Sequence, residues 1–277
     1  MFSSNKIRLF WWNEIKMQGK SKENYGDLLG KYLVEKISQK QVVWSKPSKF
    51  SIHDFFSPIY VTIGSILTNV NSKCIDWGTG IVSKEYPIKK AKFLAVRGLQ
   101  TRNHLLSQGF NVPEIFGDPA LLLPNYYNPQ IEKEYAFGIV AHYSDFNKIK
   151  DFYKNDNSIL LIDLMTNDIE ETTNAFLKCK KIVSSSLHGV IVAHAYGIPA
   201  VWQKFSRAVF GDDIKYQDYF ESVRIPNYKS DIVDTKMSIE QMEGLFIKVV
   251  SLPQKEILND LCSKLMEVCP FKPKYTK

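Results

Sequence analysis

The side chain in this sequence whose position best suits chemistry is His188. It follows Ser185 and Ser186, where the apolar run 181–183 gives way to a helical pattern. The run has the continuous apolar character of a strand buried on both faces, and the serines can cap the helix after it. His188 is therefore expected in the first helical turn, where backbone N–H groups and the helix dipole favour a bound phosphate or carboxylate.

Two basic residues and a second histidine stand at comparable places. Arg97 ends an apolar strand pattern and can hold a carboxylate or phosphate through two parallel hydrogen bonds, although a structural salt bridge is the alternative role. Lys204 follows another expected strand and would lie beside the helix bearing His188, where its ammonium group can meet a phosphate. His142 ends a third strand, so it is a further candidate for lining a cleft.

The segment Asn24-Tyr25-Gly26-Asp27 lies between the first expected strand and its helix. Gly26 allows a close approach of the backbone. Asp27 can either cap the helix or accept a hydrogen bond from a sugar hydroxyl. Both roles remain open from the sequence alone.

The elements that must position these residues alternate between short apolar runs and amphipathic stretches, which is typical of an α/β fold with parallel sheets. Strands are expected over 7–12, 42–44, 60–63, 74–77 and 93–96, and then over 135–141, 159–162, 181–183 and 200–202. Helices are expected over 27–38, 101–108, 168–178, 239–249 and 254–266. A polar linker after residue 124 predicts two domains, 1–124 and 125–277, with ligand groups at the strand ends facing a cleft between them.

Composition narrows the function classes. The chain has 277 residues, a net charge of +7 and four scattered cysteines without metal-ligand spacing. Its lysines are spread out and no nucleic-acid-binding signature accompanies them, so a nucleic-acid partner is not expected.

The cysteine pattern fits reduced thiols, and the absence of a signal-peptide layout or a long apolar run predicts a cytoplasmic protein. Its basic charge would also suit the anionic inner face of the cytoplasmic membrane. No metal or cofactor is expected.

The order and spacing of these motifs resemble the polysaccharide pyruvyl transferase family. The matching segments are Asn24–Asp27, Ile63–Leu67, Trp77–Gly80, Ala95–Gly98, Asp118–Pro119, Ser184–Trp202 and Lys215–Phe220. The resemblance implies a GT-B-like fold, in which two Rossmann-like domains face each other across a cleft. It also implies transfer of a pyruvyl group from phosphoenolpyruvate to a sugar of a bacterial surface polysaccharide precursor, with release of phosphate. The acceptor would bind on the side of 1–124 and the donor on the side of 125–277.

The resemblance also suggests roles for the candidate residues. His188 would act as a general acid, and Asp27 would orient or deprotonate a sugar hydroxyl. Arg97 and Lys204 would bind the donor's carboxylate and phosphate. The remaining substrate-binding candidates are Asn24, Gly26, Ser185, Ser186, Gly189 and His142.

One departure from the family pattern leaves alternatives open. Many members carry Arg two residues before the active-site His, whereas this chain has Ser186. Either Arg97 and Lys204 supply the missing charge, or the donor binds differently. A GT-B glycosyltransferase using a nucleotide sugar and a carbohydrate-binding protein that has lost its chemistry are the two competing hypotheses. The acceptor sugar, free or lipid-linked, and the oligomeric state have no sequence signature.

Overall fold

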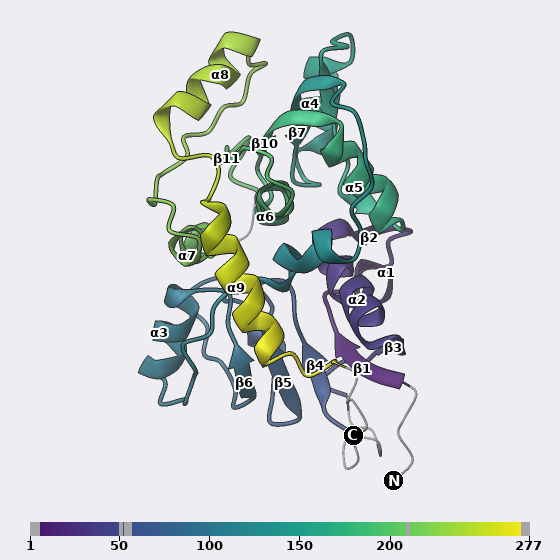
Figure 1. The fold of residues 1–277 in the computed structure, drawn as a ribbon, viewed down its shortest axis with the longest axis vertical. Helices are drawn as coiled ribbons and strands as arrows, with labels where there is room; N and C mark the ends of the chain where they lie inside the picture. The colour runs from purple at the N-terminus through teal and green to yellow at the C-terminus, as the bar shows by residue number, and fades with distance from the viewer. Residues whose placement is uncertain (1–5, 50–51, 53–56, 209–210, 273–277) are drawn as a thin grey trace.

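The structure, a computed structural model, describes residues 6–49, 52, 57–208 and 211–272 and contains two parallel β-sheets (Figure 1). The first sheet has the order β3-β1-β4-β5-β6, and the second has the order β11-β10-β7-β8. The first consists of β1 (Lys6–Phe10), β3 (Gln41–Trp44), β4 (Ile59–Val61), β5 (Cys74–Trp77) and β6 (Lys92–Ala95). The second consists of β7 (Tyr135–Val140), β8 (Ile159–Leu161), β10 (Cys179–Ser184) and β11 (Ala200–Trp202). The predicted mixed α/β fold with parallel strands is confirmed.

Helices cover both sheets, and most of them fall where the sequence predicts them. The α-helices are α1 (Glu14–Gln18), α2 (Tyr25–Ser38), α3 (Leu99–Ser107), α4 (Phe146–Tyr153), α5 (Ile169–Leu177), α6 (Leu187–Ala195), α7 (Ile214–Ser222), α8 (Ile239–Lys248) and α9 (Lys255–Glu267). Two 3-10 helices, η2 (Leu67–Asn69) and η3 (Pro119–Asn125), lie between these elements. The apolar run between Pro119 and Pro124 forms the helical segment η3.

Each sheet reverses its direction of growth at one position. The chain adds β3 on one side of β1 and then β4, β5 and β6 on the other side. In the second sheet it adds β8 on one side of β7 and then β10 and β11 on the other. At such a topological switch point the connections leave in opposite directions, and a crevice opens beyond the carboxyl ends of the strands.

Both faces of the first sheet are buried, as its apolar strands predict. Leu9 points into a core that includes α2, whereas its neighbour Phe10 points into a separate core with Leu105 of α3. The core containing Leu9 continues through η3 and α6 to the second sheet, where Ile182 belongs to it. The two halves therefore share hydrophobic packing as well as a chain connection.

The last helix runs back from the second half to the first, as Figure 1 shows for α9 in yellow. The indole Nε1 of Trp77 donates a hydrogen bond of 2.9 Å to the carbonyl of Leu265. Beyond α9, the ring of Phe271 packs edge-on against Tyr60 and Trp77. The division near residue 124 stays a prediction, and the C-terminal helix lies against elements on both sides of it.

Some elements carry no sequence signal that could predict them. β2 (Glu23–Asn24) and β9 (Met165–Thr166) are two residues each and form an antiparallel ribbon. So short a pair has no periodicity, and its two strands are separated by about half of the chain. The ribbon ties the start of α2 to the second half, which fixes the position of the Asn24–Asp27 segment.

We expect Leu265→Ala to destabilise the whole protein by about 3 kcal/mol, because this fully buried side chain of α9 packs onto Gly117 at the junction between the halves. Urea unfolding followed by circular dichroism would measure the change. Ile247→Ala, at a position on α8 that is 86% exposed, is the control and should change stability by less than about 0.5 kcal/mol. Equal effects of the two substitutions would contradict the structural role of α9.

Candidate active site

A pocket of about 590 Å³ lies at the switch points of both sheets. Trp12 follows β1 and Ser65 follows β4, while His142 follows β7 and Ser186 follows β10; all four line the pocket. The other lining residues are Glu14, Gln18, Lys20, Asn24, Asp27, Gly64, Ile66, Thr68, Asn69, Val82, Tyr143, Leu187, His188 and Lys215. Two parallel sheets thus direct their ligand-binding edges into one cavity.

His188 occupies the first turn of α6, as predicted, and its side chain is 12% exposed in the pocket. Its Nε2 lies 3.6 Å from Oδ2 of the fully buried Asp118. Among the described residues neither of these two atoms forms a hydrogen bond. Oδ1 of Asp118 accepts a 3.0 Å hydrogen bond from the backbone of Ala120. Asp118 is therefore fixed by η3, and its carboxylate lies beside the imidazole of His188.

Gly26 provides the surface on which the imidazole rests. A Cβ atom at this position would lie 2.6 Å from Cγ of His188, which is closer than side chains pack. The first turn of α2 and the first turn of α6 can approach this closely only because Gly26 has no side chain. The predicted close approach to the backbone of Gly26 is therefore present, and the side chain that approaches it is His188 from the other half of the chain.

Asp27 faces the pocket beside this contact. Its helix is capped by Asn24, whose Oδ1 accepts a 3.0 Å hydrogen bond from the N–H of Gly26, so the carboxyl of Asp27 is not the cap. Burial raises the pKa of Asp27 to about 7, against the opposing attraction of His188. A carboxyl group with this pKa can both take and give a proton near neutrality.

Two lysines bring positive charge to the pocket. Burial lowers the pKa of Lys215 to about 8, with a further contribution from the charge of Arg97. Lys20 pairs with Glu14 at 2.9 Å and lies 3.9 Å from the ring centre of Tyr143. Burial, together with Lys215 and Lys20, lowers the pKa of His142 to about 4, so its ring is neutral at pH 7.

Neither lysine was among the sequence-based candidates. Lys215 begins the Lys-x-x-Asp-Tyr block that the sequence singled out, so a signal for it was present. Lys20 lies in the loop between α1 and β2, for which the sequence offers no pattern.

The structure does not bring Arg97 and Lys204 to the wall of this pocket. Arg97 is fully buried: its Nε pairs with Asp218 at 3.0 Å, and its other nitrogens donate to Ser65 Oγ and to the carbonyl of Ile81. Through Ser65 the guanidinium supports the rim of the pocket. Lys204 forms an ion pair with Asp213.

The Ser184–Gly189 segment divides into a supporting and a lining part. Ser185 is buried, and its Oγ accepts a 2.9 Å hydrogen bond from the N–H of His142. A Cβ atom on Gly189 would lie 2.9 Å from Val140, so this glycine serves the packing of α6 on the sheet. Ser186 lines the pocket, and within the described chain its side chain forms no capping hydrogen bond to α6. The expected serine cap is therefore absent there, and the first N–H groups of α6 are available to a ligand.

Comparison with known proteins agrees with this geometry. The family model described as polysaccharide pyruvyl transferase matches residues 24–202, which include the starts of both α2 and α6. The chain belongs to the polysaccharide pyruvyl transferase family. Membership implies transfer of a pyruvyl group to a polysaccharide. An uncharacterized protein of Acanthamoeba polyphaga mimivirus is 34% identical over 203 residues, which are 71% of this chain and 69% of the viral protein.

The structure describes residues 6–49, 52, 57–208 and 211–272 of this family member. They contain no group of three or more His, Cys, Asp or Glu side chains placed to hold a metal ion. They also contain no helix long and apolar enough to cross a bilayer.

We expect Gly26→Ala to displace the imidazole of His188, because the added methyl group would overlap its ring. Imidazole signals in NMR spectra would report the displacement. Gly244→Ala in α8, where nothing lies within 4 Å of the added Cβ, is the matched control. It should leave His188 unchanged and stabilise the protein by up to about 1 kcal/mol. Unperturbed His188 signals in Gly26→Ala would refute the close contact.

Proposed function

We propose that this protein transfers the pyruvyl group of phosphoenolpyruvate to two hydroxyls of a sugar, forming a pyruvate ketal and releasing phosphate. The observation that carries the proposal is the convergence, in one pocket, of His188 at the start of α6, the Lys215 ammonium and the Asp27 carboxyl. These groups match an anionic donor that must gain a proton and an acceptor that must lose one.

The donor's phosphate and carboxylate are assigned to the positive side of the pocket. Lys215 and the uncapped N–H groups of α6 provide charge and hydrogen-bond donors there. Lys20 stands at the same wall with Tyr143. Lys215 thus replaces the charge that the family's Arg would supply at the position of Ser186.

The chemistry balances without a further reactant. A proton added to C3 of the donor turns the methylene into a methyl group and leaves cationic character at C2. One sugar hydroxyl attacks C2, phosphate leaves, and a second hydroxyl attacks C2 to close the ketal. Of the two protons that the hydroxyls lose, one replaces the proton given to C3 and the other leaves with phosphate.

His188 and Asp27 are assigned the two proton-transfer roles. His188 lines the pocket beside Asp27, and its imidazole is assigned the delivery of the proton to C3. The carboxyl of Asp27, with its pKa near 7, accepts the proton of the attacking hydroxyl and can pass it on. The charge of His188 opposes the burial that raises the pKa of the Asp27 carboxyl.

We further propose that the two halves, divided near residue 124, form the GT-B-like pair of Rossmann-like units, with the donor held by the second half. In this arrangement the acceptor is a bacterial polysaccharide precursor, free or lipid-linked, approached from the side of the first half. The net charge of +7 would attract the protein to an anionic membrane surface in the cytoplasm.

Phosphate release from phosphoenolpyruvate with a panel of sugar acceptors tests the proposal. His188→Ala should lower the acceptor-dependent rate by about 10² to 10⁴-fold, because the general acid is lost. His104→Ala is the control, since His104 lies on the surface in α3 and hydrogen bonds to Tyr86 and Gln108. The control should retain the parent rate.

The same assay separates the competing functions. Acceptor-dependent release that survives in His188→Ala would remove His188 from the chemistry. Silence of the parent protein across all acceptors, together with turnover of a nucleotide sugar, would replace pyruvyl transfer by glycosyl transfer. Silence with every donor would favour the carbohydrate-binding hypothesis.

Lys215 is expected to make the affinity of the pocket for the donor depend on pH. Below its pKa of about 8 the ammonium attracts phosphate, and above this pH the charge is lost. We therefore expect the dissociation constant of phosphoenolpyruvate to rise as pH increases from 7 to 9. Calorimetric titration of Lys215→Gln should show weaker binding and lose this step. An unchanged step in the variant would show that another group is responsible.

A further inference from the structure

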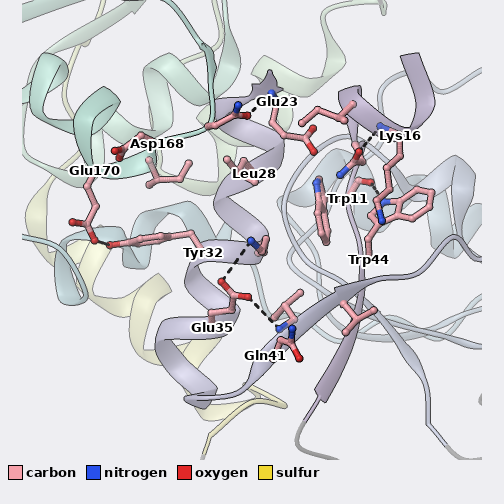
Figure 2. Close-up of a pocket in the computed structure, with 17 residues that line it drawn as sticks. Trp11, Lys16, Glu23, Leu28, Tyr32, Glu35, Gln41, Trp44, Asp168 and Glu170 are labelled. Carbon is pink, nitrogen blue, oxygen red and sulfur yellow. Dashed lines mark hydrogen bonds and ion pairs between the residues drawn. The ribbon is translucent and has the colours of Figure 1, made fainter. Parts of the chain in front are cut away.

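A second cavity, which we call the groove, has a volume of about 760 Å³ and lies on the other side of residues 11–16, which form one wall of the candidate active site. Figure 2 shows the side chains that line the groove. It is lined by α2, by the whole of β3, by the residues after β1 together with α1, and by the start of α5. It therefore joins elements of both halves of the chain. The lining residues that the argument uses are Trp11, Tyr32, Glu35, Trp44, Asp168 and Glu170.

Aromatic side chains held by hydrogen bonds line this groove. Nε1 of Trp44 donates to the carbonyl of Trp11 at 3.1 Å, which fixes the half-buried indole at the groove. The Tyr32 hydroxyl donates to Glu170 at 2.6 Å, a contact between α2 and α5. Rings fixed in this way offer apolar surface without losing side-chain freedom on binding. Ile15 and Val43, which are exposed by 42% and 37%, extend the apolar surface.

The charge of the groove is opposite to that of the whole chain. Its carboxylates, Glu23, Glu35, Asp168 and Glu170, outnumber the lining ammonium groups, Lys16 and Lys31, in a chain whose net charge is +7. Two of these carboxylates are paired: Glu35 lies 3.9 Å from Lys31, and Glu170 lies 3.2 Å from Lys36 beside the groove. An anionic donor is therefore disfavoured here. Carboxylate and amide oxygens next to aromatic faces suit a neutral ligand rich in hydroxyls, because each hydroxyl can donate a charge-assisted hydrogen bond.

The groove and the active-site pocket share one wall. Along residues 11–16, Trp11, Asn13, Ile15 and Lys16 line the groove, whereas Trp12 and Glu14 line the pocket. The carboxylate of Glu23, in the groove, accepts a 2.7 Å hydrogen bond from the N–H of Glu14. Glu14 in turn pairs with Lys20 in the pocket. A ligand that extends past this wall would reach both cavities.

We propose that the groove binds a run of neutral sugar residues of the polysaccharide acceptor, adjacent to the sugar that is modified in the pocket. This proposal rests on the proposed function, because it takes the acceptor to be a polysaccharide. The groove would hold the chain by contact with the rings of Tyr32 and Trp44 and by hydrogen bonds to Glu35 and Glu170. The ammonium groups of Lys36 and Lys16 lie 5.0 Å from the centres of these two rings, so the sugar would contact the ring surface beside them. The pocket would then receive the adjoining sugar.

Calorimetric titration with neutral di- to hexasaccharides of glucose, mannose, galactose and N-acetylglucosamine, in the absence of donor, tests the groove. The parent protein should bind at least one of these series. Tyr32→Ala removes a ring, and Glu35→Gln removes a charge while keeping the acceptor for the N–H of Val42. Each should weaken binding about tenfold. Glu35→Gln also serves where Tyr32→Ala fails to fold, as judged by circular dichroism.

The control is Asp260→Asn, at an exposed carboxylate on α9 that pairs with Lys264, and it should bind like the parent. No binding of any oligosaccharide to the parent, or parent-like binding by both groove variants, would overturn the proposal. Donor-dependent phosphate release is measured separately. Oligosaccharide binding without phosphate release would leave the groove in place and reject the proposed reaction, and the reverse result would reject the groove alone.

Discussion

The close contact between the start of α2 and the start of α6 is the constraint on which the site depends. The imidazole of His188 lies on Gly26 at a distance that leaves no room for a Cβ atom. This contact forms where the switch points of two parallel sheets face each other, so the crevices of both sheets become one cavity. The β2–β9 ribbon and the return of α9 hold the two halves in this relation.

Burial is the cause of the site's electrostatics. The same enclosure raises the pKa of Asp27 to about 7 and lowers that of Lys215 to about 8, because both groups lose hydration in their charged forms. Their mutual attraction reduces both shifts without removing them. The pKa values of this carboxyl and this amine, which in water lie far from 7, are thereby brought close to 7. Both groups can then exchange protons readily at neutral pH.

The pocket also depends on groups that no ligand reaches. Arg97 and Asp218 form a fully buried pair that also holds Ser65 and Thr101, and removing either charge would leave the other unpaired inside the protein. The pair thus fixes the loop after β4 at the rim. The α1–β2 segment also lies between two cavities of different charge. Lys20 and Lys215 line the active-site pocket, whereas four carboxylates and two lysines line the groove.

The sequence by itself determined the alternation of strands and helices and the place of His188 in the first turn of α6. These features follow from local periodicity and from short-range rules for strand and helix ends. Tertiary structure alone decided that Lys20 and Lys215 face the pocket while Arg97 is enclosed by Asp218. The local sequence around a basic residue is compatible with either position, and only the elements packed against it determine whether its charge meets a ligand or another side chain.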